Sequence, residues 1–114
     1  MTLTERQQAF LLLNGWLQLQ YGQAERACIL LDALLHLSPD HLAARRCRLV
    51  ALLKSGQGVR AQQEATWLVL NDDPQPGSWL CLSRAHQLSG ELELARHAYQ
   101  RYLELEEQYE SAQP

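Results

Sequence analysis

The sequence predicts an all-α fold built from three similar helix–turn–helix units, and three observations support this class. Leu, Ala, Gln, Glu and Arg dominate the chain, and all five are good helix formers. No stretch rich in Val, Ile and Thr alternates apolar and polar residues in the way a half-buried strand does. Glycines recur at a fixed period. The 114 residues, 46% of them hydrophobic, suffice for one domain with a modest core.

Six helical segments are predicted, separated by short breaks rich in Gly, Pro, Ser and Asp. Their expected ranges are Thr4–Gln20, Ala24–Leu37, His41–Lys54, Val59–Leu70, Ser78–Leu88 and Leu92–Tyr109. A capping box, either Thr4 with Gln7 or Thr2 with Glu5, predicts the first start. We expect Asp40 and Ser78 to cap the third and fifth helices, and residues 111–114 to be frayed.

The breaks are periodic. Gly22, Gly56 and Gly90 lie 34 residues apart, and so do the three alanines that follow them, Ala27, Ala61 and Ala95. A period of 34 is typical of the tetratricopeptide repeat, a helix–turn–helix unit, and the chain resembles this family. We therefore expect one domain over residues 1–114, with repeats at about 8–41, 42–75 and 76–109. Each glycine would end a helix in a left-handed turn, and each alanine would let two helices approach closely.

The repeats match the family pattern unequally. The third is the closest, with Trp79, Leu82 and a small Ser83, and it carries His86 in place of the usual tyrosine. The first has Gly15 at the small position. The second departs most, because arginines 45 and 48 occupy positions that are normally apolar, so its packing register is the least defined.

The resemblance to this repeat also implies a concave surface lined by the first helix of each unit. The expected lining residues are Leu12, Trp16, Leu19, Arg46, Val50, Leu53, Leu80, Arg84 and Leu88, with Lys54 at the edge. Such an apolar strip suits the apolar face of an amphipathic helix. The alternative is that a tightly wound array closes on itself, which would make these residues ordinary core.

Charge is unevenly distributed around a net value of -3. Residues 42–61 contain five basic side chains and no acid, whereas residues 91–110 contain six acids against two arginines. Either these are solvated helix faces or they form a polar rim for a partner. Nothing in this balance calls for nucleic acid.

No enzyme site is predicted. The chain contains no G-x-S-x-G, P-loop or G-x-G-x-x-G motif, and its four histidines have no metal-ligand spacing. Cys28, Cys47 and Cys81 form no CxxC pair, so we expect them to be small buried apolar residues. We therefore expect no cofactor and no metal.

The first twenty residues do not read as a signal peptide, and no apolar stretch approaches the ~20 residues of a membrane span. We expect a cytoplasmic protein without membrane insertion.

In its length, repeat count, leading helix and missing capping helix, the chain resembles, over residues 1–110, one family of chaperones. These are the tetratricopeptide-type chaperones of type III secretion needle subunits, the G component of the Ysc, Psc and Asc systems of Gram-negative bacteria. The resemblance implies that the groove holds the amphipathic C-terminal helix of the needle subunit and prevents premature polymerisation. It also implies a small helical-hairpin co-chaperone against the N-terminal helices, giving a 1:1:1 heterotrimer.

Two alternatives remain open at this point. The protein could be a chaperone of translocator proteins, which resembles this family but is usually longer. It could instead be a tetratricopeptide scaffold in a cell-envelope assembly, bound through its convex face. We also expect the isolated chain to fold poorly without a partner.

Overall fold

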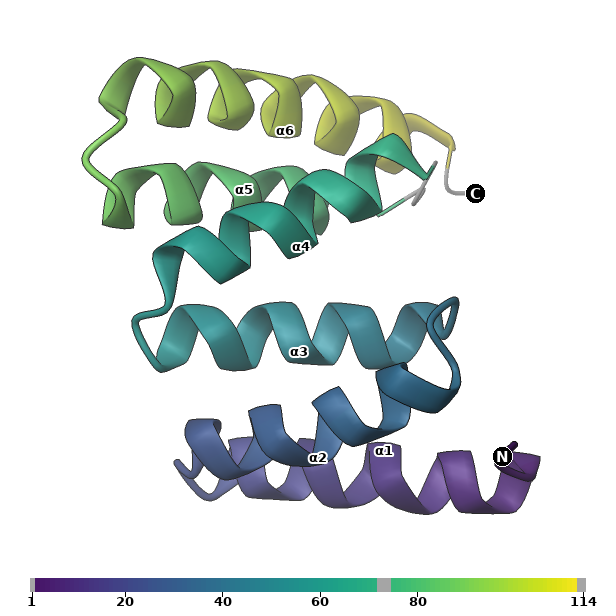
Figure 1. The fold of residues 1–114 in the computed structure, drawn as a ribbon. Helices are drawn as coiled ribbons and strands as arrows, with labels where there is room; N and C mark the ends of the chain where they lie inside the picture. The colour runs from purple at the N-terminus through teal and green to yellow at the C-terminus, as the bar shows by residue number, and fades with distance from the viewer. Residues whose placement is uncertain (1, 72–74, 113–114) are drawn as a thin grey trace. The chain divides into compact units, whose positions relative to one another are not determined.

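The computed structural model describes residues 2–71 and 75–112, and these form six α-helices without a strand (Figure 1). The helices are α1 Glu5–Gln20, α2 Ala24–Leu37, α3 Leu42–Lys54, α4 Gly58–Leu70, α5 Gly77–Leu88 and α6 Leu92–Ala112. The all-α class and the positions of the six helices are confirmed.

The N-terminal caps agree with the sequence in one case and differ in another. At α1 the capping box of Thr4 and Gln7 is present: the Gln7 N–H donates to Thr4 Oγ1 at 3.1 Å, and the Thr4 N–H donates to Gln7 Oε1 at 2.9 Å. At α3 the predicted cap Asp40 is wrong. The helix begins one residue later than expected, so His41 is the cap, and its Nδ1 accepts from the Ala44 N–H at 3.2 Å.

The ends of α5 and α6 also correct the prediction. Pro76 already has helical dihedral angles, so α5 begins at Gly77, and Ser78 lies buried in the first turn instead of capping it. Helix α6 continues past Tyr109, and residues 111 and 112 are helical. No Gly or Pro interrupts α6 in this stretch, which explains its extension. Residues 113 and 114 of the predicted frayed end lie outside the described residues.

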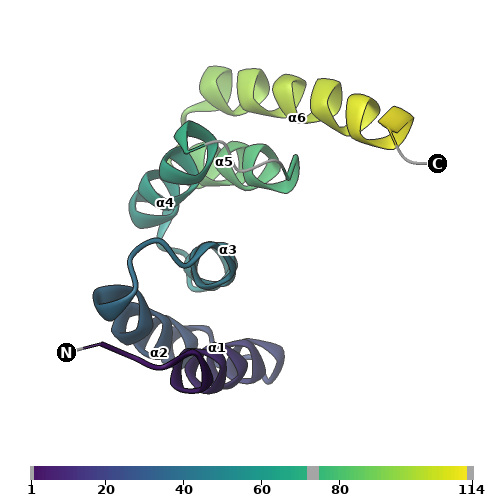
Figure 2. The ribbon, with the colours of Figure 1, turned by 90° about the vertical axis from the view of Figure 1, so that its right-hand side faces the viewer.

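The helices fall into two compact units, residues 1–56 and 57–114. In the first unit α2 packs on both α1 and α3, and α1 also touches α3 (Figure 2). In the second unit α5 packs on both α4 and α6. The boundary lies between the two predicted helices of the second repeat. The single domain with a groove running along all three repeats therefore stays a prediction.

The three periodic glycines adopt the left-handed turn that the sequence predicts. Their φ values are 76°, 74° and 75° for residues 22, 56 and 90. At the first turn the Gln23 N–H bonds the Gln18 carbonyl at 2.8 Å, and the Gly22 N–H bonds the Leu19 carbonyl at 3.1 Å. This pair of bonds is the Schellman motif, which satisfies the free carbonyls at a helix end. At each repeat, therefore, a helix ends at a glycine with positive φ.

Small residues lie where paired helices approach each other. Gly15 of α1 is buried against α2: a Cβ at this position would be 2.9 Å from Cδ2 and Cγ of Leu31. In the second unit Ser83 of α5 is buried, and its Oγ donates to the Ala95 carbonyl of α6 at 2.7 Å. Ala27 and Ala61 are fully buried. The predicted role of these small positions is confirmed.

The two arginines at normally apolar positions are half-buried, and the Arg48 side chain is only 17% exposed. Arg48 of α3 pairs with Asp32 of α2, with Nη1 and Oδ1 3.0 Å apart. Arg45 donates through Nε to the Pro39 carbonyl at 2.7 Å. Both interactions reach back to α2 or to the turn that follows it. One cluster of the core of the first unit consists of Leu31, Leu34, Leu35 and Ala44.

A polar cluster ties the second unit together. Gln62 of α4 donates through Nε2 to His86 Nδ1 of α5 at 2.9 Å and also to the Glu91 carboxylate before α6. The hydrogen bond from Gln62, followed by the contact with His86, lowers the pKa of Glu91. His86 therefore fills the usual tyrosine position of the repeat with a group that bridges helices.

A glycine substitution tests the helix stop. Gly90→Ala is expected to lower the free energy of unfolding by about 1 kcal/mol, because a Cβ disfavours positive φ. Gly77→Ala is the matched control, since Gly77 has no positive φ and its added Cβ meets no atom within 4 Å. It should leave stability unchanged or raise it by a few tenths of a kcal/mol. Urea unfolding measures both, and equal losses would contradict the assignment.

The close approach of α1 and α2 yields a second expectation. Gly15→Ala should destabilise the protein by about 1–3 kcal/mol, because the new methyl overlaps Leu31. Leu31→Ala should cost about 2–5 kcal/mol on its own. The double variant should be more stable than the sum of the two losses predicts, since each change makes room for the other. Additive losses in a double-mutant cycle would show that the two residues do not compete for space.

Candidate partner-binding surfaces

The first unit holds six of the nine predicted lining residues, on two helices that touch. Leu12, Trp16 and Leu19 follow one another on α1 at spacings of four and three residues, so they share one side of that helix. Arg46, Val50 and Leu53 repeat the same spacing on α3. Because α1 contacts α3 within this unit, the two rows belong to neighbouring helices.

Burial separates these residues into two kinds. Leu19 is only 4% exposed, so it is a core residue and offers a partner no surface. Leu12 is half-buried and packs on the core cluster. Trp16 is 49% exposed, although tryptophan usually buries most of its large apolar area. Arg46, Val50 and Leu53 are half-buried. The accessible part of this row on α1 is therefore dominated by Trp16.

The second unit holds the other three residues, spaced four apart along α5. Leu80 is half-buried, Arg84 is exposed, and Leu88 is exposed. Arg84 is close enough to Cys81 to oppose the rise that burial gives to the pKa of its thiol. Whether this row continues the row of the first unit as one groove stays a prediction.

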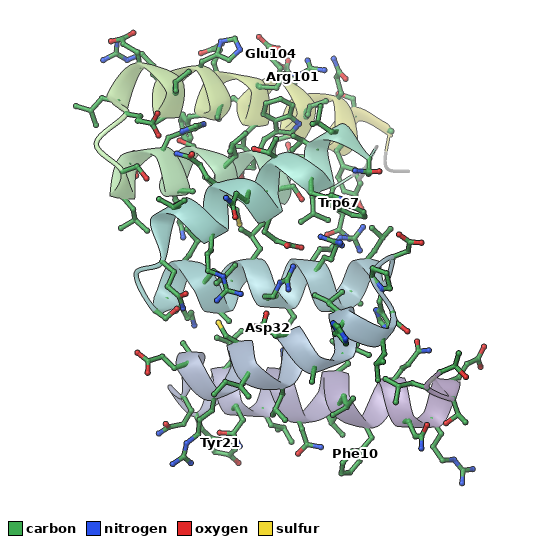
Figure 3. All side chains as sticks on the ribbon, viewed as in Figure 1. Phe10, Tyr21, Asp32, Trp67, Arg101 and Glu104 are labelled. Atoms are coloured by element: carbon green, nitrogen blue, oxygen red, sulfur yellow. The ribbon has the colours of Figure 1, made fainter. Side chains whose placement is uncertain are left out.

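A second apolar surface on α1 was not anticipated. Phe10, Leu13 and Tyr21 are all exposed, by 67%, 53% and 78%, and Leu17 between them is half-buried. Figure 3 shows Phe10 and Tyr21 on the side of α1 away from α2. We call these four residues the outer face of α1. The sequence carries the signal, since apolar residues at 10, 13, 17 and 21 follow helical spacing.

A hollow adjoins the start of this outer face. Its volume is about 430 Å³, and Leu3, Arg6, Gln7, Phe10 and Leu11 line it. Arg6 is the one charged residue among these five, and three of the others are apolar, so an apolar side chain of a partner fits the hollow.

The three cysteines lie in buried or half-buried positions. Cys28 is buried, Cys47 and Cys81 are half-buried, and all three are free thiols. Burial raises the pKa of Cys47 and of Cys81, which keeps both thiols protonated near neutral pH. Among residues 2–71 and 75–112, no group of three or more His, Cys, Asp or Glu could hold a metal ion, and no helix could cross a membrane.

Comparison with known proteins gives three similar chains and no match to a family model. Each relative is named "Chaperone protein YscY"; one is from Yersinia pestis and two are from Yersinia enterocolitica. Identity is 71% over 110 residues, which cover 96% of this chain and 96% of each relative. The sequence resembles a chaperone family of the Ysc system, and the relatives' name also contains the word chaperone and the prefix Ysc. The component letter differs: it is Y in the relatives and G in the family that the sequence resembles. The chain belongs to the family of chaperone protein YscY.

Proposed function

We propose that this protein is a cytoplasmic chaperone of type III secretion that binds an amphipathic helix of an exported protein and keeps that protein from assembling before export. The observation that carries the proposal is the half-exposed Trp16 on α1, a helix that contacts α3, in a chain whose relatives are named chaperones. Contiguous exposed apolar surface with a polar rim marks binding sites in folded proteins.

The surface also indicates the chemistry of the bound helix. An aromatic anchor in a half-buried apolar setting contributes strongly to binding, at ~25 cal/mol for each Å² of apolar surface covered. Helix α3 carries four basic residues and no acid between Leu42 and Lys54. Arg46 lies within the lining row of α3, and Lys54 lies at its end. We therefore expect an apolar helix face flanked by carboxylates, because opposite charges on the two sides speed and orient docking.

The expected client is a protein that has an apolar helix face flanked by carboxylates. The needle subunit is the client that the sequence resemblance implies, and its C-terminal helix is one occupant of the proposed kind. A translocator protein is another. The chaperone name of the relatives favours either client over a permanent scaffold in a cell-envelope assembly, because a chaperone must release what it binds.

The outer face of α1 supports a second partner in the same complex. Its exposed residues carry no charge, and it begins beside the hollow at Leu3 and Phe10. A small helical-hairpin co-chaperone could cover this face while the client occupies the Trp16 surface. The proposed complex is then a 1:1:1 heterotrimer, in which each partner contacts a different side of α1.

Two substitutions on α1 separate the two surfaces. In Trp16→Asp, client binding should fall by at least about 100-fold, because a charge replaces the aromatic anchor. In Phe10→Asp, the client should still bind and the co-chaperone should be lost, because Phe10 lies about 120° around the helix from Trp16. The measurement is affinity purification from a Gram-negative cell that carries the secretion system, with mass spectrometry of the co-purified proteins.

Each variant is the control for the other, because both introduce one aspartate at an exposed position of α1. Their circular dichroism should match that of the unchanged protein. If both variants lose both partners, or if Trp16→Asp retains an exported protein, the division of α1 into two binding surfaces is wrong.

A further inference from the structure

We infer that the C-terminal end of α6 is a docking surface for a basic amphipathic helix of a partner protein. Helix α6 has 21 residues, whereas α5, which packs against it, has 12. The two are joined by a short turn around Gly90 and run in opposite directions. At 1.5 Å per residue, α6 is roughly 30 Å long and α5 roughly 18 Å. Figures 1 and 2 both show α6 running past the beginning of α5.

The face of α6 that meets α5 continues beyond the end of α5. Ala95, Ala98, Tyr102, Leu105 and Tyr109 follow one another at spacings of three, four, three and four residues. This spacing keeps all five on one side of a helix, and we call them the α6 seam. Burial falls along the seam: the two alanines are buried, Tyr102 and Leu105 are half-buried, and Tyr109 is 51% exposed. Leu105 and Tyr109 therefore extend a packing surface that α5 does not reach.

Charge determines what can cover this surface. Glu106 is half-buried and, at 100° per residue, lies beside the seam, whereas Glu107 points to the opposite side and is exposed. Both arginines of α6 already pair with other carboxylates of the helix: Arg96 with Glu93 at 2.9 Å, and Arg101 with Glu104 at 3.3 Å (Figure 3).

The wider setting is also acidic. Residues 57–114 contain four arginines and nine acids, which gives 4 − 9 = −5. The C-terminal end of a helix is the negative end of its dipole, where cations are favoured. The occupant must therefore carry lysine or arginine beside an apolar stripe.

This chemistry distinguishes the occupant from the other candidates. The client helix proposed above faces the basic helix α3 and needs carboxylates, so it is a poor fit here. If a second copy packed its α6 seam against this one, Glu106 and Glu110 of the two copies would face each other. Like charges at an interface oppose binding. A basic amphipathic helix satisfies both the apolar seam and its acidic border.

The test uses the full chain and two 18-residue helical peptides with the same leucine stripe, one carrying lysine and one carrying glutamate at the polar positions. Binding is followed by fluorescence anisotropy of labelled peptide. The lysine peptide should bind at least tenfold more tightly than the glutamate peptide. Tyr109→Ser should weaken lysine-peptide binding roughly tenfold and Glu106→Gln about threefold.

Matched variants keep the result specific. Ile29→Ser removes an exposed apolar side chain from α2, in the other unit and outside the proposed binding surfaces. Glu107→Gln removes the same charge as Glu106→Gln from the opposite side of α6. Neither should alter binding. Tyr109→Phe retains the ring and should bind as the unchanged protein does. The inference is overturned if Glu106→Gln and Glu107→Gln act equally, or if the lysine peptide does not bind. It is also overturned if Tyr109→Ser abolishes a concentration-dependent dimer of the free protein.

Discussion

The close approach of paired helices is the constraint on which the remaining structure depends. Gly15 meets Leu31 across α1 and α2, and the Ser83 hydroxyl bonds the Ala95 carbonyl across α5 and α6. A Cβ added to Gly58 would lie 3.1 Å from Cβ of Leu88, so α4 and α5 approach in the same way. Helices packed through such small residues bury little side-chain area for each contact. The cores are consequently rich in leucine and alanine, and no aromatic side chain is fully buried in the described part of the chain.

Because small residues form the contacts between helices, the large apolar side chains lie elsewhere. Phe10, Trp16 and Tyr21 on α1 and Tyr109 on α6 are all about half exposed or more. Within its unit α6 packs on α5, and the outer face of α1 points away from α2. The first and last helices of this chain therefore carry the surfaces that suit partners. The three surfaces differ in charge: basic beside Trp16, neutral on the outer face of α1, and acidic along the α6 seam.

The sequence predicted the helices well because Gly and Pro determine where they stop. The left-handed glycines can be read directly from the 34-residue period, whereas a cap depends on the geometry of the turn before it. A shift of one residue was enough to make His41 the cap of α3 instead of Asp40. The surfaces were harder to predict. Leu19 shares a side of α1 with Trp16, yet Leu19 is buried and Trp16 is half exposed. Leu19 lies one turn after Gly15, which packs against Leu31 of α2. The outer face of α1 was not predicted, because the family pattern assigns binding positions to only one side of that helix.

The unequal lengths of α5 and α6 have a consequence for the backbone as well as for the surface. From Glu107 to Ala112 every residue of α6 is exposed, and an exposed helical end of this length opens readily. Amide hydrogens in this stretch should exchange with solvent faster than those around Ala98. The far end of α6 would thus act as a local probe, since slower exchange there would show that another molecule has come to lie against it.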